Sequence, residues 1–253
     1  MRITQEYLDS IKANGREMLK PDWKMFNHRL TDQGKRKESP VLDYTTSYDT
    51  VIDLSAPDMD ALPNTSFYES SQSRTSVREF SEDNLTQNEL SFLLWETAHI
   101  KEQHSTWSRR PIPSAGGRHC LKTYLYIDRV EDIPKGIYLY VPDNHSLRLT
   151  APHTDTQKKR LCTALCGQDF GSQVVFLWSA VPSVMEYRYS TVAHKMIAME
   201  AGHICQNLHL ACESIGCGCC AISAYFQSSV DKLVKIDGEE EFVIYTAFAG
   251  RKL

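Results

Sequence analysis

The sequence has no apolar run long enough to cross a membrane, and it begins with polar residues. Residues 1–7 lack the apolar core of an export signal, and no later stretch approaches the roughly 20 residues that a bilayer-spanning helix needs. The sequence also has no excess of basic residues: 28 Lys and Arg stand against 32 Asp and Glu, a net charge of −4. Nucleic acids and membrane surfaces attract strongly basic proteins, so we expect neither as a partner and we expect a cytoplasmic protein.

The chain also lacks the glycine-rich fingerprint G-x-G-x-x-G, which holds the pyrophosphate of a dinucleotide in Rossmann folds. Nothing in the sequence therefore distinguishes NADH from NADPH as a ligand. Cysteine is not lacking, since there are eight. Without an export signal, we expect these thiols to remain reduced.

Helical and strand patterns alternate along the chain without the strict period of a doubly wound sheet. The residue patterns predict helices over 5–18, from Thr86 to Ala98, over 154–166 and over 191–215, and strands over 122–129, 137–141, 174–178 and 242–248. This order favours an α+β fold. We expect residues 66–253 to form one domain and residues 1–65 to form an N-terminal extension, either an arm that wraps a partner subunit or a loosely ordered tail.

A Ser-rich loop leads into Ser73-Arg74-Thr75-Ser76-Val77-Arg78-Glu79-Phe80. In an extended segment, Arg74, Ser76 and Arg78 fall on one side because strand side chains alternate. Two guanidinium groups and a hydroxyl group suit the oxygens of a phosphate. The segment therefore predicts a phosphate site, with an ordinary solvated surface segment as the alternative.

Two further motifs follow. The turn Pro113-Ser114-Ala115-Gly116 has small side chains that allow backbone N–H groups to approach a flat ligand. The apolar run from Phe242 to Phe248 ends in Ala249-Gly250-Arg251, which places a third arginine at the end of a predicted strand.

The blocks RTSVREF, PSAGG and EAGHICQNLHLACESIG, in this order, resemble the nitroreductase superfamily of flavoproteins and, within it, the SagB-type or ThcOx-type dehydrogenases. The resemblance covers roughly residues 66–251. It implies a mixed or antiparallel central sheet flanked by helices, an intertwined homodimer, and non-covalent FMN at the dimer interface.

The resemblance also assigns residues to the flavin. Arg74, Ser76 and Arg78 match the motif that holds the phosphate and ribityl chain, and Arg251 matches a basic position that completes the phosphate site. The turn of Pro113, Ser114, Ala115 and Gly116 would lie along the isoalloxazine of the partner subunit. A segment facing the ring edge and N5 would contain Gly218, Ala221, Ile222, Ser223 and Ala224. Many relatives carry an acidic residue at the position of Ser223 or Ala224, so this contact departs from the family pattern.

Arg188-Tyr189 falls where the azoline-oxidising members carry a Lys-Tyr pair. Arginine remains protonated and cannot act as a base, which argues against azoline oxidation on a peptide. Tyr189 is the candidate proton donor, with structural packing as the alternative.

Glu200, His203 and Asn207 form a polar stripe on the long predicted helix. We interpret it as part of an interface, with a satisfied buried network as the alternative.

The resemblance and the motifs together predict an FMN-dependent oxidoreductase in which NAD(P)H reduces the flavin and a small-molecule acceptor then reoxidises it. The acceptor could be a nitroaromatic, a quinone, an enone or an azoline. A flavin-binding protein without turnover is one alternative. Another is a metal-binding or thiol-redox protein built on Cys217, Cys220, Cys205, His209 and Cys212. We favour buried thiols and no metal site.

Overall fold

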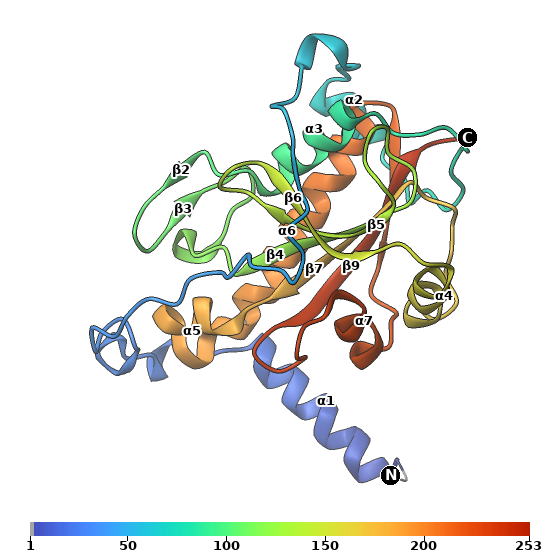
Figure 1. Cartoon of the computed structure of the whole chain (residues 1–253). Coiled ribbons are helices and arrows are strands. Elements are labelled where there is room, and N and C mark those ends of the chain that lie inside the picture. Colours follow the sequence, from blue (N-terminus) through green and yellow to red (C-terminus); the bar gives the residue numbers. More distant parts are fainter. Residues whose placement is uncertain (1–2) are drawn as a thin grey trace.

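A computed structural model describes residues 3–253. Its central sheet has seven strands in the order β1-β6-β5-β4-β7-β9-β8, and every neighbouring pair is antiparallel (Figure 1). The strands are β1 (Val51–Asp53), β4 (Leu121–Ile127), β5 (Gly136–Val141), β6 (Ser146–Pro152), β7 (Val174–Ala180), β8 (Cys217–Ile222) and β9 (Phe242–Arg251). A separate hairpin joins β2 (Glu102–Gln103) to β3 (Ser108–Arg109).

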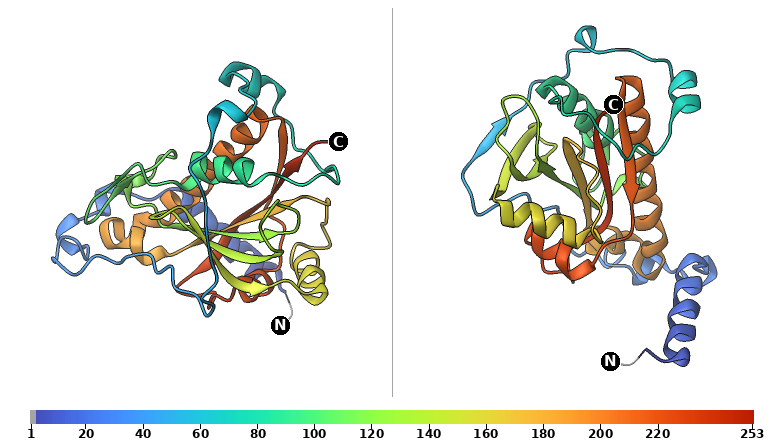
Figure 2. Two further views of the ribbon diagram at one scale, coloured as in Figure 1. Left: turned by 45° about the horizontal axis from the view of Figure 1, so that its top comes forward. Right: turned by 90° about the vertical axis from the view of Figure 1, so that its right-hand side faces the viewer.

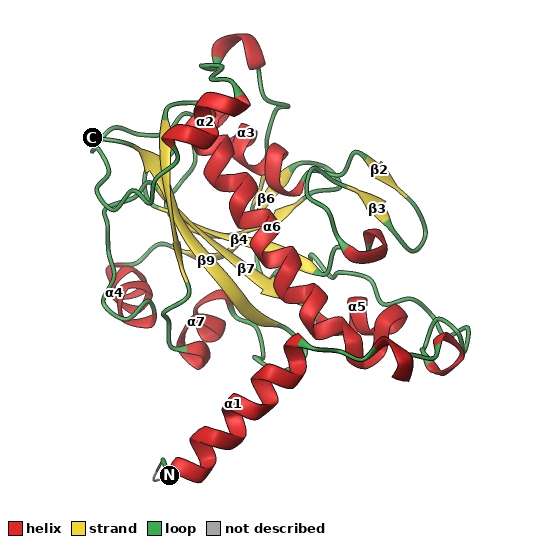
Figure 3. Cartoon of the chain, turned by 180° about the vertical axis from the view of Figure 1, so that it is seen from behind, coloured by secondary structure: helices red, strands yellow, loops and turns green. Residues whose placement is uncertain are grey.

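Helices cover both faces of this sheet. The α-helices of the described chain are α1 (Gln5–Leu19), which projects away from the sheet (Figure 1), α2 (Phe67–Ser73), α3 (Gln87–Ala98), α4 (Asp155–Ala164), α5 (Pro182–Tyr189), α6 (Ala193–Ser214) and α7 (Gln227–Val234). The long helix α6 crosses one face, while α4 and α7 lie on the other (Figures 2 and 3). The α+β class and the antiparallel sheet flanked by helices are confirmed.

Side-chain alternation along the strands divides the core into two layers. Leu125 of β4 and Phe176 of β7 belong to the cluster that packs on α3 and α6. Their chain neighbours Tyr124 and Leu177 belong to the cluster beneath α4 and α7. Both β4 and β7 are buried on both faces, which explains the continuous apolar and aromatic runs from Tyr124 to Ile127 and from Val174 to Trp178.

The helix termini follow the expected capping chemistry. Thr86 and Glu89 form a capping box that starts α3, as the sequence predicts. Helix α6 ends before Gly216, whose φ of 75° is a conformation that glycine adopts without a steric penalty.

One local prediction is wrong, because the Ser-rich loop is instead helix α2, which begins with a capping box formed by Ser66 and Glu69. The residues from Cys217 to Ile222 form the edge strand β8. Tyr189 is the last residue of helix α5.

The N-terminal extension is structured in part. Helix α1 projects away from the body of the chain (Figure 1). Further along, β1 pairs with β6 at the edge of the main sheet, and Leu54 and Leu62 enter the core. The division at residue 65 remains a prediction. Among residues 3–253, no helix is both long and apolar enough to cross a membrane.

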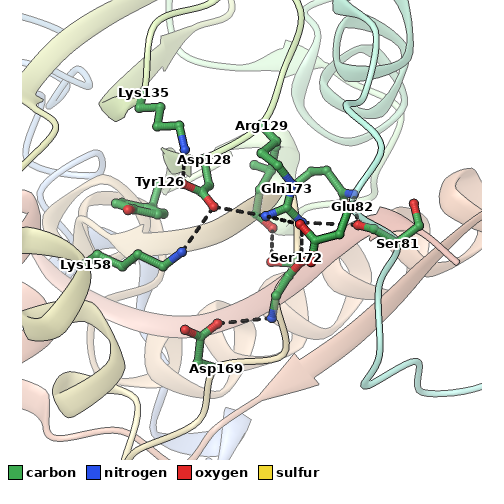
Figure 4. A network of polar contacts seen from close by, with 12 residues as sticks. Ser81, Glu82, Tyr126, Asp128, Arg129, Lys135, Lys158, Asp169, Ser172 and Gln173 are labelled. Carbon is green, nitrogen blue, oxygen red and sulfur yellow. Dashed lines mark hydrogen bonds and ion pairs between the residues drawn. The ribbon is translucent and has the colours of Figure 1, made fainter. Parts of the chain in front are cut away.

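A buried polar network attaches the loop after the arginine segment to the sheet. Asp128, at the end of β4, accepts hydrogen bonds from Lys135 at 3.0 Å and from Lys158 at 3.2 Å, which approach it from two sides (Figure 4). Arg129 donates to the carbonyl oxygens of Ser81 and Gly171 at 3.2 and 2.6 Å. The network therefore holds residues 81–85 beside the sheet by charge-assisted hydrogen bonds.

Candidate functional site

The predicted phosphate segment lies along the exposed edge of β8. Ser76 forms a parallel bridge with Cys219, and the backbone N–H of Val77 donates to the Cys219 carbonyl oxygen at 3.0 Å. Arg74 follows directly after α2 and is half-buried within electrostatic range of His209. Arg78 is exposed, and its Nη1 donates to the Ser76 carbonyl oxygen at 3.4 Å. Among the described residues, no carboxylate lies within ion-pair distance of Arg74 or Arg78.

Arg251 lies near this segment, because its carbonyl oxygen accepts from the N–H of Ser81 at 3.0 Å. Its guanidinium group, however, donates to the Asn84 carbonyl oxygen at 2.8 Å and forms an ion pair with Glu89 at 2.9 Å. The Glu89 side chain is 7% exposed. The charge of Arg251 is therefore already neutralised within the chain, and its guanidinium group does not fit the role of a free phosphate ligand.

A second ion pair at the same edge was missed by sequence reasoning. Lys252 Nζ lies 2.6 Å from Glu213 Oε2, and Ser73 Oγ donates to the same oxygen at 3.1 Å. The only signal in the sequence was a lysine directly after Arg251. This contact attaches the end of α2 and the end of β9 to helix α6.

The predicted ring-edge segment runs through β8 and past its end. A Cβ atom on Gly218 would lie 2.6 Å from Val77 Cγ2, so the glycine is required for the arginine segment to pack closely on β8. Ala221 and Ile222 complete the strand. Ser223 and Ala224 are exposed in the loop that follows, where the Ala224 carbonyl oxygen accepts from Gln168.

The turn at Pro113 to Gly116 contacts α6 at Glu200 and His203. Gly116 and Gly117 have φ values of 59° and 64°, which favour glycine. A Cβ atom on Gly116 would lie 2.7 Å from the Tyr189 hydroxyl and 3.0 Å from Arg188 Nη1. The structure therefore places Tyr189 against the predicted flavin turn. The Tyr189 ring also meets Trp23 edge-to-face at 6.4 Å.

Two side chains of helix α6 form hydrogen bonds with this turn. Ser114 Oγ donates a hydrogen bond to the Glu200 carboxylate, and His203 Nδ1 donates to the Pro113 carbonyl oxygen at 3.1 Å. These residues line a cavity of about 260 Å³ with Ala115, Met196 and Met199. Burial raises the pKa of Glu200 to about 7, although the Ser114 hydroxyl opposes this shift.

The stripe on α6 makes contacts within one chain. Glu200 and His203 contact the turn, and Asn207 donates to the Glu96 carbonyl oxygen at 2.8 Å. Glu200 Oε1 is buried without a hydrogen-bond partner, so the network is satisfied only in part, and the interface interpretation stays a prediction. The α6 residues that are exposed instead include Ala198, Met199, Gly202 and Gln206.

The predicted turn and the residues next to the arginine segment contact different parts of α6. Ser114 contacts Glu200, whereas Ser73 and Lys252 contact Glu213. At a rise of 1.5 Å per residue, the 13 helical positions between these glutamates span about 20 Å. Arg74 follows Ser73 and lies within electrostatic range of His209, between these two positions.

The structure separates the two thiols of the Cys-x-x-Cys motif. Cys217 belongs to the core layer under α6, while Cys220 lies in the opposite layer. Three positions apart on a strand, the two thiols point to opposite faces and cannot share one ion. Among residues 3–253, no cluster of three His, Cys, Asp or Glu side chains is placed to hold a metal ion.

Comparison with known proteins agrees with this fold. The Nitroreductase family model matches residues 72–251. A protein of Methanocaldococcus jannaschii that bears a nitroreductase name is 27% identical over 183 residues, which cover 71% of this chain and 88% of that protein. A solved nitroreductase-type protein of Ralstonia eutropha has a TM-score of 0.64 and 24% identity, covering 86% of this chain and 98% of the other. A chain of the E. coli microcin synthetase McbBCD complex, with truncated pro-MccB17 bound, has a TM-score of 0.60 and 19% identity, covering 99% and 95%. The chain belongs to the nitroreductase family.

Proposed function

We propose that this oxidoreductase binds FMN non-covalently and uses NAD(P)H to reduce a small-molecule acceptor in two separate half-reactions. Bound FMN would supply the hydride chemistry at N5, and the protein would supply binding, orientation and electrostatics. The acceptor belongs to the classes that take a hydride from a flavin, such as a nitroaromatic, a quinone or an enone.

The observation that carries this proposal is the pair of unneutralised arginines beside β8. Arg74 and Arg78 flank the exposed Ser76 on a segment held to Cys219 by a backbone hydrogen bond. Two guanidinium groups and a hydroxyl group without a carboxylate partner suit a phosphate dianion. Arg251 is a positioning residue in this proposal, since its bonds to Glu89 and Asn84 fix the loop that follows the segment.

The proposed site needs a second copy of the chain. Along α6, the contact of Ser114 with Glu200 and that of Ser73 with Glu213 are about 20 Å apart, so we place the turn of one chain and the arginine segment of the other at the same flavin. A two-fold arrangement that packs α6 against its copy in an antiparallel manner would bring the Gly116 end of one chain to the Arg74 end of the other. The exposed small residues Ala198 and Gly202 would allow the two helices to approach closely.

The residues around the turn would then act on protons and orientation. Gly116 keeps its backbone open to a flat ligand, and Tyr189 holds a hydroxyl proton directly against that turn. Glu200 can hold a proton near neutral pH because burial raises its pKa to about 7. These groups would stabilise the turn and offer a proton at its edge.

A peptide azoline remains the second candidate substrate, favoured by the structural similarity to the microcin synthetase chain over 99% of this protein. Arg188 argues against it, because a guanidinium group cannot take up the proton that azoline oxidation releases. Assignment to the SagB-type branch depends on this point and is part of the proposal.

The visible spectrum of the purified protein tests the function. We expect a flavin spectrum that bleaches when NADH or NADPH is added under nitrogen. Arg74→Ala combined with Arg78→Ala should give a colourless, folded protein, because both phosphate-binding charges are removed. The matched control, Arg16→Ala with Arg160→Ala, removes two exposed arginines elsewhere and should keep its colour. Undiminished flavin in the first variant would refute the assigned phosphate site, and a stable flavin colour without bleaching would refute turnover.

A further inference from the structure

A second cavity, of about 340 Å³, lies on the other side of the Gly116 turn from α6. Its walls come from the N-terminal segment 39–44, the β2–β3 hairpin and the residues just after the turn. The volume falls in the range of pockets that hold small organic ligands. No part of the proposed flavin chemistry uses this cavity.

The cavity is cationic. Arg110 and Arg118 both line it, and among the described residues no carboxylate lies within 4 Å of either guanidinium group. The only acidic residue in the lining is Asp143, which is exposed at the rim. The next cation, Arg188, lies close enough to Arg118 to add repulsion.

Arg118 is the more unusual of the two, because it is only 7% exposed. Its Nε donates to the Val184 carbonyl oxygen at 2.9 Å and its Nη2 to Ser39 Oγ at 3.0 Å, while Nη1 donates to the Thr106 carbonyl oxygen. These partners satisfy N–H groups but supply no negative charge. A buried cation without a counter-charge is costly, and proteins normally pair it.

Polar groups facing the cavity also lack partners. His119 is 3% exposed, and its Nδ1 has no hydrogen-bond partner. The buried Tyr44 hydroxyl likewise has none. Arg110 makes one side-chain hydrogen bond, from Nε to Ser108 Oγ at 3.3 Å. Its guanidinium group also acts on the Tyr44 hydroxyl and, at longer range, on Glu200, but among the described residues no carboxylate forms an ion pair with it.

We propose that this cavity binds a small organic carboxylate. The carboxylate would lie beside Arg110, accept hydrogen bonds from its guanidinium group and from the Tyr44 hydroxyl, and supply the negative charge that Arg118 lacks. Leu42, Ile100, Val184 and the indole of Trp107 provide apolar walls for the rest of the ligand. Inorganic phosphate would satisfy the cations but not these walls.

Calorimetric titration of the full chain with three probes tests the proposal. Benzoate should bind at one site per chain. Benzamide, which has the same shape without the charge, should bind at least about tenfold more weakly, because a charge-assisted bond is roughly twice as strong as a neutral one. Inorganic phosphate should not displace benzoate from this site.

Variants locate the binding. Arg110→Gln should weaken benzoate about 10-fold to 100-fold, the range expected for loss of hydrogen bonds to a charged group. Tyr44→Phe, which keeps the ring, should weaken it several-fold. Arg16→Gln makes the same chemical change on the exposed face of α1 and should leave binding unchanged. Flavin content should be equal in all of these proteins, which separates this site from the flavin site.

Four results would overturn the proposal. They are absence of benzoate binding at millimolar concentration, equal affinity for benzamide, displacement of benzoate by phosphate at equal affinity, and indifference to both Arg110→Gln and Tyr44→Phe. If Arg110→Gln fails to fold, Tyr44→Phe alone decides, because it removes a single oxygen atom that has no partner in the chain.

Discussion

Gly218→Ala should destabilise the protein through a single contact. The added methyl group would lie 2.6 Å from Cγ2 and 2.8 Å from Cβ of Val77, distances that real Cβ atoms do not adopt. Val77 cannot move freely, because its backbone N–H donates to Cys219 in the neighbouring position of β8. The arginine segment must therefore shift away from the strand, or the sheet edge must deform.

The expected cost can be estimated from two opposing effects. Overpacking a fitted contact costs about 1–3 kcal/mol. Replacing glycine by alanine restricts the unfolded chain and returns about 0.4–1 kcal/mol. The net loss is about 1–2 kcal/mol, which for a chain of this size lowers Tm by about 2–8 °C. Thermal denaturation followed by circular dichroism would measure it.

A double-mutant cycle makes the test specific. Val77→Ala alone should destabilise the protein by about 1 kcal/mol because it removes partly buried methyl groups. In the Gly218→Ala background, the same change should restore stability, since it creates room for the new methyl group. Gly15→Ala, where no atom lies within 4 Å, should not lower Tm. If Val77→Ala costs the same in both backgrounds, the steric argument is wrong.

Three further predictions concern buried titratable groups. Burial, with a smaller contribution from His99, lowers the pKa of His145 to about 4. The free energy of unfolding should therefore be highest above pH 6.5 and fall by up to about 3 kcal/mol as the pH drops to 4. His145→Asn should flatten this slope in urea titrations at several pH values. Burial raises the pKa of Glu200 to about 7. The free energy of unfolding should therefore be highest below pH 4.5 and fall by up to about 3 kcal/mol as the pH rises through 7. Glu200→Gln should be more stable than the parent at pH 8 but not at pH 5. Burial would raise the pKa of Asp128, but hydrogen bonds from Lys135 and Lys158 lower it below 3.8. Asp128→Asn should lower the free energy of unfolding by about 1–2 kcal/mol at pH 7, measured with denaturant. This loss should vanish as the pH falls through the folded pKa of Asp128.

The elements that the sequence predicts are those whose signal is local or continuous. The capping box at Thr86 specifies the start of α3 by hydrogen bonds within four residues. The run from Val174 to Trp178 is apolar at every position because both faces of β7 are covered. Such patterns depend little on the rest of the chain, so they can be recognised without coordinates.

The misread elements depend on distant partners. Strand β8 contains Gly218 and three cysteines, a composition with weak strand preference, and it forms because β9 offers a free edge from Thr246 to Arg251. The partner of Arg251 could not be predicted, because Glu89 is 162 positions away in the sequence. Neither could the cavity at Arg118 be foreseen, since its walls come from five segments that are separate in the sequence. Contacts of this kind depend on tertiary packing, which overrides local propensity.

Mixing two defective chains would test whether the flavin site is shared between subunits. One chain would carry Arg74→Ala and Arg78→Ala, and the other would carry Gly116→Val, whose side chain would collide with the Tyr189 hydroxyl. If each site combines the arginine segment of one chain with the turn of the other, a mixed dimer contains one doubly damaged site and one intact site. Random pairing makes half of the dimers mixed, so about a quarter of all sites should regain flavin, whereas neither parent binds it. If both parts came from the same chain, every site would remain damaged and mixing would restore no colour.

A control mixture combines Gly116→Val chains with chains carrying Arg16→Ala and Arg160→Ala. Each mixed dimer should then contain one intact site, and each unmixed control dimer should retain both. This result would show that subunits exchange without loss of the cofactor. Recovery in the first mixture would therefore show that the arrangement at the two ends of α6 is completed only by a second copy of the chain.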